Sequence, residues 1–315
     1  MDGKKHYDYL VGLMRREDHK EAERTMHSLF VELNKLNGIY WIVSSAFFLQ
    51  TLYGIDVSAI INASKQKLTP FPEVTVAELG GPLRALSLVQ LCVLLKVEIP
   101  EKIKNEAIDF LKENFSATKI FWFDMRSLYC SLLILRLTNS LNVLPNHINQ
   151  NIIEYIYESQ SVLGGFGAGP RSEAHGGYTF CAVACIKMLH ADVPRLSRLT
   201  RWLEVRLSQY NGRPGKPADS CYVWWCSASM VLIGRQDIVS REKQRLLTFI
   251  NNHCLCPESG GYSKYPSIPL EDPSSVHGKQ EPDLLHTFLA ITCNALLHSL
   301  EDPKIDPVSV LPTET

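Results

Sequence analysis

The segment 211–226 brings together three kinds of chemistry that no other segment of the chain combines. It opens as a turn rich in Gly and Pro that carries two cations, Arg213 and Lys216. Asp219 and Cys221 follow, two positions apart, at the start of a predicted helix rich in aromatic residues. Cations suit an anion, and a carboxylate beside a thiolate suits a metal ion. Aromatic side chains suit an apolar ligand. The segment therefore predicts one part of a composite site.

The rest of the chain is predicted to be helical. Apolar residues recur with helical spacing, and the alternation typical of strands is almost absent. Helices that are apolar nearly all round alternate with amphipathic ones, such as 195–208 and 241–252. The predicted helices cover residues 20–50, 55–66, 82–95, 101–114, 124–138, 147–159, 175–190, 194–208, 219–234, 238–254 and 283–299.

Glycine-rich turns recur at Gly165, Gly212 and Gly261, which are 47 and 49 residues apart. Such spacing indicates repeated helical hairpins. An inner ring of apolar helices inside an outer ring of amphipathic ones would bury this pattern. We therefore expect an all-α protein with one domain over 1–315, an α/α barrel (toroid) of about six helical hairpin repeats. An open superhelical solenoid is the alternative. The Pro- and Ser-rich segment 266–281 predicts a surface insertion loop.

Polar residues at the starts of the apolar helices follow the same repeat. Arg126, His175 and Cys221 are 49 and 46 residues apart, and His286 follows 65 residues later because the insertion lies between. In a barrel, equivalent positions of successive repeats lie on one rim. The repeat therefore predicts that several polar residues converge at one end of the barrel: Arg126, His175, Arg213, Lys216, Asp219, Cys221 and His286.

Asp219, Cys221 and His286 together offer a carboxylate oxygen, a thiolate sulfur and an imidazole nitrogen. Zinc accepts all three, and a fourth position left open is typical of a catalytic site. On its own, the Asp-x-Cys pair is more typical of a helix-capping Asp beside a buried Cys. The matching rim position of His286 favours the metal. The cluster 253–256, with one His and two Cys, is less favoured because no fourth ligand lies nearby.

An anion could bind beside this metal. Arg213, Lys216 and His175 could cradle a phosphate-type group, although exposed cations and a capping histidine are the commoner outcomes. Tyr222 could add a hydroxyl donor or simply pack. The aromatic residues of the apolar helices are expected to fill the core, unless the barrel is hollow. In that case some of them would line a pocket for a long hydrocarbon.

Composition narrows the function and the location. The 315 residues are 45% hydrophobic and 21% charged, with a net charge of −1, which gives no reason to expect binding to nucleic acid or to an acidic membrane. No apolar run reaches the roughly 18 residues of a membrane span. The nine cysteines are scattered and odd in number. We therefore expect reduced thiols and a cytoplasmic location.

Four segments are similar to signatures of the β subunits of heterodimeric protein prenyltransferases. Residues 212–222 resemble that family's zinc and diphosphate segment, and 124–130, 172–181 and 282–287 resemble three others. The similarity covers most of 120–300. It is weaker in the N-terminal third, where it rests on Lys5-His6 and on 37–41. It implies that Asp219, Cys221 and His286 bind zinc, that His175, Arg213, Lys216 and Tyr222 hold a prenyl diphosphate, and that Arg126 lies near the shared cavity.

The resemblance also implies the reaction. A geranylgeranyl group would pass from geranylgeranyl diphosphate to a C-terminal cysteine thiol of small GTPases, with an obligatory α subunit as partner. Asn37 stands where farnesyl-transferring enzymes carry Trp, which favours the longer lipid, and Trp41, Tyr178 and Trp225 would line its pocket. Lys264 stands where magnesium-dependent relatives carry Asp, which implies that Mg²⁺ is not required.

The subtype stays open at this stage. Lys264 and the site segments resemble type I enzymes, which act on C-a-a-X proteins ending in Leu, and we favour that type. Segments 37–41 and 232–237 look more like the Rab-directed type II enzymes. A farnesyltransferase β subunit and a non-catalytic helical scaffold are further alternatives. A terpenoid cyclase is disfavoured because the sequence has neither an acidic protonating motif nor a magnesium-binding carboxylate cluster.

Overall fold

The computed structural model describes residues 3–17, 26–68, 75–116, 124–267 and 281–313. These residues form twelve α-helices and two short strands. The helices are α1 (Gly3–Glu17), α2 (Met26–Tyr53), α3 (Ser58–Leu68), α4 (Pro82–Leu95), α5 (Glu101–Phe115), α6 (Met125–Leu137), α7 (Asn146–Glu158), α8 (Gly176–Met188), α9 (Leu196–Gln209), α10 (Cys221–Leu232), α11 (Gln236–Thr248) and α12 (Leu284–His298), and the strands are β1 (Ile305–Asp306) and β2 (Leu311–Pro312).

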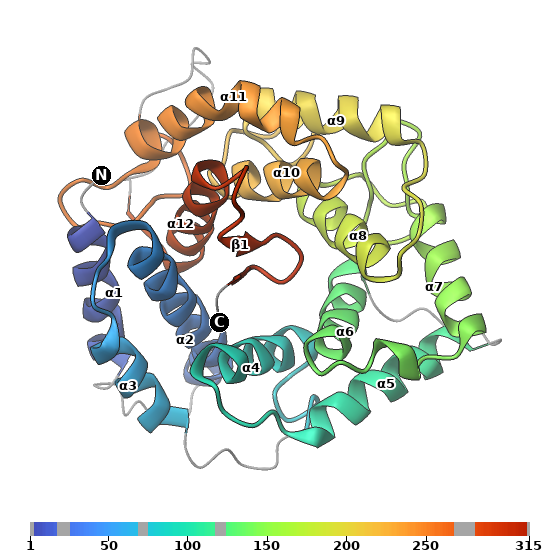
Figure 1. Ribbon diagram of the computed structural model, residues 1–315, viewed down its shortest axis with the longest axis horizontal. Coiled ribbons are helices and arrows are strands. Elements are labelled where there is room, and N and C mark those ends of the chain that lie inside the picture. The colour runs from blue at the N-terminus through green and yellow to red at the C-terminus, as the bar shows by residue number, and fades with distance from the viewer. Residues whose placement is uncertain (1–2, 18–25, 69–74, 117–123, 268–280, 314–315) are drawn as a thin grey trace.

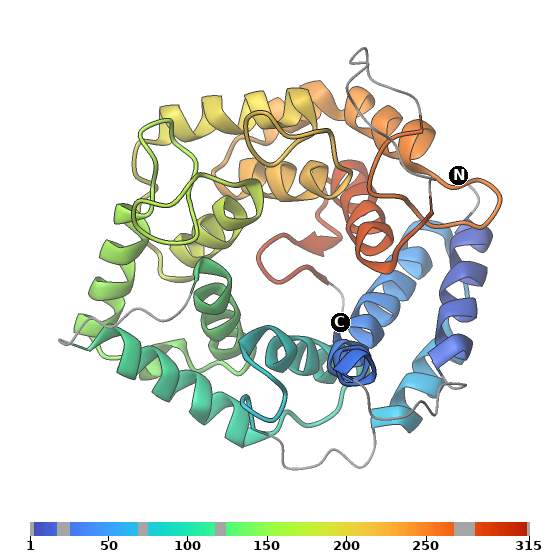
Figure 2. The same ribbon diagram turned by 180° about the vertical axis from the view of Figure 1, so that it is seen from behind.

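The helices form a closed ring of two layers (Figure 1). The even-numbered helices form the inner layer, where each packs against the next and α12 returns to pack against α2. The odd-numbered helices lie outside them, as the view from behind also shows (Figure 2). The predicted α/α toroid of six hairpins is therefore confirmed. The contact between α12 and α2 rules out the open solenoid.

The two layers follow from the composition of their helices. Helix α8 of the inner ring buries nearly its whole length, because α6 and α10 pack against it within the inner ring and α7 packs against it from the outer ring. Helix α9 of the outer ring buries Leu199, Leu203 and Leu207 and exposes Arg198 and Arg201. A helix covered on one face only needs apolar residues on that face only, so the amphipathic pattern marks the outer layer.

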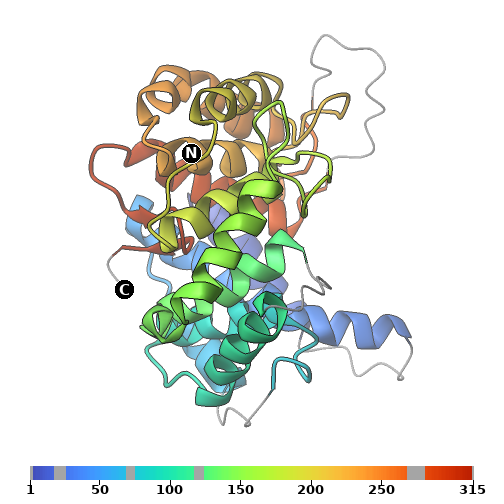
Figure 3. The same cartoon turned by 90° about the vertical axis from the view of Figure 1, so that its right-hand side faces the viewer.

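One α-helix and one β-hairpin were not predicted. Helix α1 packs against α2 through a narrow apolar stripe that includes Leu10 and Met14, and its many charged residues hide that stripe in the sequence. Strands β1 and β2 pair in a hairpin that reaches towards the centre of the ring (Figure 1). Strands of two residues are too short to show alternation. In the side view, this hairpin lies on the opposite side of the ring from the loops that precede α8 and α10 (Figure 3).

Other predictions bear on the surface and on the cysteines. The predicted insertion 266–281 falls almost entirely on 268–280, outside the described residues. All nine cysteines are free and buried, as expected of reduced thiols. Within the described ranges, no helix combines the length and apolarity needed to cross a membrane.

Candidate metal and anion site

The three candidate metal ligands meet where α10 and α12 begin. Asp219 and Cys221 stand at the start of α10, and His286 lies in the first turn of α12. Their ligand atoms all lie within 4.8 Å of one another, and all three residues are buried. His286 Nε2 is 3.3 Å from Asp219 Oδ1. Ligand atoms about 2.0–2.1 Å from a tetrahedral zinc ion lie about 3.3 Å apart, so this spacing fits zinc.

Asp219 caps its helix as well. Its Oδ1 accepts a hydrogen bond from the backbone N–H of Cys221 at 3.0 Å. The capping interpretation and the metal interpretation are therefore compatible, because the cap orients the carboxylate whose oxygen faces His286. Burial alone would raise the pKa of Asp219, but hydrogen bonds from His286 and Cys221 outweigh it and lower that pKa. The carboxylate is thus ionised, as a metal ligand must be.

His286 is oriented by a second carboxylate that the sequence did not single out as functional. Asp283 caps α12 by accepting from the backbone N–H of His286 at 2.9 Å, and its Oδ2 lies 2.5 Å from His286 Nδ1. The other ring nitrogen is thereby turned towards Asp219, the arrangement in which a carboxylate supports a metal-binding histidine. Burial would lower the pKa of His286, but its bonds to Asp219 and Asp283 raise it to about 9.

Beside the metal ligands, His175 and Tyr222 form a pair. His175 Nδ1 accepts from the backbone N–H of Gly177, so the neutral ring carries its proton on Nε2. That nitrogen lies 2.8 Å from Tyr222 Oη and donates to it. The hydroxyl hydrogen of Tyr222 is then available to an oxygen of a bound anion. Burial and the nearby Arg213 lower the pKa of His175, and burial raises the pKa of Tyr222, which keeps the imidazole neutral and the phenol protonated.

One cation lies beside the metal ligands, and two more lie on the turn that precedes them. Lys264 Nζ is 3.8 Å from Asp219 Oδ2 and lies over the ring of Tyr265. Arg213 forms an ion pair with Glu173, which precedes α8. Lys216 is exposed on the same turn, and its backbone carbonyl accepts from Asn211 Nδ2 at 2.8 Å. Of the two cations on the turn, Arg213 lies near the His175–Tyr222 pair, since its charge lowers the pKa of His175, whereas the Lys216 side chain is exposed.

Arg126 joins the group through aromatic contacts. Its guanidinium lies 5.3 Å from the centre of the Tyr178 ring, and it is paired with Asp124. The Tyr178 ring is in turn 5.4 Å from the ring of His175. A continuous series of contacts thus runs from α6 across α8 to α10. The structure thus groups six of the predicted rim residues, whereas Lys216 is exposed on the turn beside them; the six are Arg126, His175, Arg213, Asp219, Cys221 and His286.

The residues assigned to a lipid pocket belong to the inner helices. Asn37 is buried on α2, and its Oδ1 accepts from the Ser87 hydroxyl at 2.9 Å. Trp41 and Trp225 are half-buried and pack against the core, with the Trp225 ring 5.0 Å from that of Phe180. These residues therefore lie on helices of the inner layer and pack within it.

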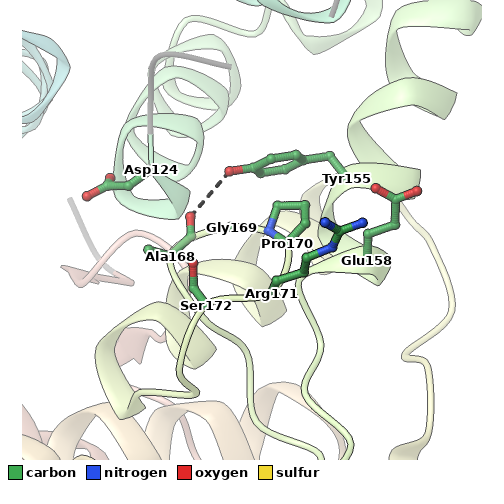
Figure 4. Close-up of a pocket in the computed structure, with 8 residues that line it drawn as sticks. All are labelled: Asp124, Tyr155, Glu158, Ala168, Gly169, Pro170, Arg171 and Ser172. Atoms are coloured by element: carbon green, nitrogen blue, oxygen red, sulfur yellow. Dashed lines mark hydrogen bonds between the residues drawn. The ribbon is translucent and has the colours of Figure 1, made fainter. Parts of the chain in front are cut away.

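A separate pocket beside the rim was not predicted (Figure 4). It has a volume of about 680 Å³ and lies between α7, the start of α6 and the loop that leads to α8. The Tyr155 hydroxyl donates to the Ala168 carbonyl at its wall. Its lining residues are Asp124, Tyr155, Glu158, Ala168, Gly169, Pro170, Arg171 and Ser172. Among these lining residues, Asp124 connects the pocket to the rim, because it forms an ion pair with Arg126.

Comparison with known proteins identifies the family. Residues 1–311 match the family described as the prenyltransferase alpha-alpha toroid domain. The chain therefore belongs to this family, which agrees with its closed ring of helical hairpins.

Similar proteins are β subunits of three enzymes. The chain is 32% identical over 201 residues to geranylgeranyl transferase type-1 subunit beta of Arabidopsis thaliana, across 59% of this chain and 48% of that protein. It is 27% identical to the type-2 subunit beta of Saccharomyces cerevisiae, across 98% of this chain and 93% of that protein. It is 34% identical to the protein farnesyltransferase subunit beta of Arabidopsis thaliana, across 36% of this chain and 23% of that protein. The match thus spans about half of the type-1 relative and nearly all of the type-2 relative.

A solved structure shares the fold. Candida albicans protein geranylgeranyltransferase-I complexed with GGPP superposes with a TM-score of 0.71, covering 100% of this chain and 96% of that one. The two sequences are 18% identical in this superposition, so the match concerns the fold alone.

Proposed function

We propose that this chain is the catalytic β subunit of a zinc-dependent protein geranylgeranyltransferase. It would transfer the lipid from geranylgeranyl diphosphate to a C-terminal cysteine thiol of small GTPases in the cytoplasm. The observation that carries this proposal is the buried set Asp219, Cys221 and His286, with ligand atoms within 4.8 Å of one another, beside a cluster of cations and hydrogen-bond donors. Membership of the prenyltransferase toroid family supports the same reaction.

The ligand set defines what the metal would do. Asp219, Cys221 and His286 would hold zinc, and three protein ligands would leave a position for the substrate thiol. When bound, zinc supplies the positive charge that keeps the substrate thiol ionised near neutral pH. Asp283 holds His286 with Nε2 turned towards Asp219, so that this nitrogen would be free to bind the metal. Neither a helix cap nor a scaffold requires three different ligand types, two of them two positions apart and the third 65 residues beyond Cys221.

The neighbouring groups would bind the diphosphate. Tyr222 donates its hydroxyl hydrogen to a phosphate oxygen, with its oxygen held by His175. Arg213 and Lys216 stabilise the negative charge that grows as the diphosphate leaves. Lys264, close to Asp219, would supply the charge that magnesium supplies elsewhere, so the reaction would not require Mg²⁺. Asn37, Trp41, Arg126, Tyr178 and Trp225 would contact the lipid or the protein substrate.

The subtype we propose is type I, because Lys264 lies within the site itself. A specific observation favours the Rab-directed type II enzyme as the second candidate: the yeast type-2 relative matches almost the whole chain. In both cases an α subunit would complete the enzyme, since the family members named above are subunits.

A transfer assay with the co-purified αβ heterodimer tests the proposal. Farnesyl and geranylgeranyl diphosphate are each offered with C-a-a-L peptides, and separately with full-length Rab and its escort protein. Geranylgeranylation of the peptides supports type I, whereas modification of Rab alone supports type II. Zinc content is measured in parallel for the native protein and for Cys221→Ala. No transfer to any acceptor, together with a zinc content that Cys221→Ala does not change, would favour the scaffold and refute the proposal.

A further inference from the structure

A tight turn at residues 260–264 connects the two segments that carry the metal ligands. Ser220, between Asp219 and Cys221, donates its backbone N–H to the Lys264 carbonyl and its hydroxyl to the Ser263 carbonyl, both at 2.9 Å. These two bonds attach the start of α10 to the turn.

The same turn holds the start of α12. The backbone N–H of Tyr262 donates to Thr287 Oγ1 at 2.9 Å, and the N–H of Asp283 donates to the Tyr262 carbonyl at 3.2 Å. Thr287 directly follows His286, and Asp283 orients its ring. The turn therefore sets the distance between the segment that bears Asp219 and Cys221 and the segment that bears His286.

The N-terminal helix α1 holds this turn from outside. His6 is 2% exposed, and its Nδ1 accepts from the backbone N–H of Gly261 at 3.1 Å. Its ring stacks on that of Tyr262, with centroids 4.9 Å apart and planes 17° apart. Lys5 and Tyr9 donate to the carbonyls of Pro257 and Pro282, each at 3.1 Å. One helix thus binds residues on both sides of the turn.

There is little space in which the turn could shift. Gly260 and Gly261 have φ angles of 72° and 78°, which favour glycine. A Cβ on Gly260 would lie 2.4 Å from the Lys5 carbonyl oxygen. A Cβ on Gly261 would lie 2.9 Å from Thr287 Oγ1 and from the Tyr9 ring. Helix α1, the turn and α12 are therefore in close contact.

We propose that His6 is a positioning residue of the metal site, although it lies more than 200 residues from every ligand in sequence. By fixing Gly261 and Tyr262, it keeps Asp219, Cys221 and His286 at the spacing that zinc requires. This inference rests on the proposed function, since it presumes that the three residues hold zinc. Loss of a supporting residue typically costs about 10–100-fold in metal affinity. Because His6 acts through the turn, we expect about tenfold, the lower end of that range.

Two substitutions separate positioning from packing. His6→Phe keeps a ring to stack on Tyr262 but removes the acceptor for the Gly261 N–H. His6→Asn replaces Nδ1 by a carbonyl oxygen and restores that acceptor. His147→Phe is the matched control, because His147 is exposed on α7, across the ring from α1 (Figure 1). Ser220→Ala, which removes the hydroxyl bond to Ser263, provides a second variant that leaves α1 unchanged.

Zinc affinity of the αβ heterodimer is measured by competition with a chromophoric chelator, and Co²⁺ is substituted to report the ligand geometry through its absorption. We expect His6→Phe and Ser220→Ala to weaken zinc binding about tenfold and to change the Co²⁺ spectrum. His6→Asn should restore both readouts, and His147→Phe should leave both unchanged. If His6→Phe does not fold, His6→Ala takes its place, because it also removes the acceptor for the Gly261 N–H and has the same expected result.

Two outcomes overturn the inference, and they differ in meaning. If the native heterodimer binds zinc and His6→Phe binds it equally well, even with a lower melting temperature, His6 only stabilises the fold. If the native heterodimer binds no zinc at all, the proposed function fails and this inference fails with it.

Discussion

Gly212→Ala should disable the diphosphate donors while leaving the fold intact. The Gly212 carbonyl accepts from the backbone N–H of Gly176 at 2.8 Å, which brings the 211–219 turn against the start of α8. A Cβ added at Gly212 would lie 2.1 Å from Tyr222 Cε1, 2.2 Å from Cζ and 2.7 Å from Oη. Normal carbon contacts are about 3.5–4.0 Å, so the Tyr222 ring has to move by about 1.5 Å.

The structure sets the size of the effect. Forcing an added methyl group into a packed site costs about 1–3 kcal/mol. A ring displaced this far loses the 2.8 Å bond between Tyr222 Oη and His175 Nε2, which is worth about 0.5–1.5 kcal/mol net. We expect a loss of stability of about 1.5–4.5 kcal/mol, from these two terms together. A displacement of this order at a reacting group reduces kcat/KM about 100-fold.

The assay is steady-state transfer with varied prenyl diphosphate, combined with thermal unfolding. Gly12→Ala is the matched control, since a Cβ at Gly12 meets nothing within 4 Å. In the middle of α1, this change should stabilise by about 0.5–1 kcal/mol and leave transfer unchanged. Tyr222→Phe should reduce transfer, and adding Gly212→Ala to it should cost much less than in the native protein. A native kcat/KM in Gly212→Ala, or full additivity with Tyr222→Phe, would refute the reasoning.

Three further predictions concern the metal, the cation and the lipid. Apparent zinc affinity should rise towards pH 9, because zinc has to displace one proton from His286 and one from the Cys221 thiol, and burial raises the pKa of that thiol. Displacement of two protons gives a rise of up to about 100-fold per pH unit. A zinc affinity that does not change with pH would contradict this expectation. The folded pKa of His286 lies above its ordinary value, so its proton stabilises the metal-free protein at low pH, and this contribution to stability is lost as pH rises through about 9. Lys264→Asp should make transfer depend on Mg²⁺, measured as turnover against Mg²⁺ concentration, and an unchanged requirement would remove the role given to Lys264. Asn37→Trp should lower the geranylgeranyl-to-farnesyl ratio of kcat/KM at least about tenfold, with Asn37→Ala as control, and an unmoved ratio would show that Asn37 does not limit the lipid pocket.

Sequence alone determined the ring and most of its helix boundaries. Helix α4 begins at Pro82, as the Gly-Gly-Pro turn predicted, because proline fits the first turn of a helix. Helices with apolar residues all round belong to the inner layer, since burial on every side requires them. The repeat also placed Asp219, Cys221 and His286 at one end, because equivalent positions of a closed ring share a rim.

Only the tertiary structure decided how these groups are held. Asp283 orients His286 from three residues away at the start of the same helix, so that contact is local. By contrast, the room that the Gly212 turn leaves for the Tyr222 ring and the support that His6 gives to the turn at 260–264 are tertiary contacts. No local sequence pattern encodes these two tertiary contacts. Each joins segments whose relative positions are set by the packing of the whole ring. The C-terminal hairpin is a further case. Its carbonyls at Val308 and Ser309 accept from Tyr129 and Gln90, far away in sequence, and such long-range bonds stabilise strands too short to form by themselves.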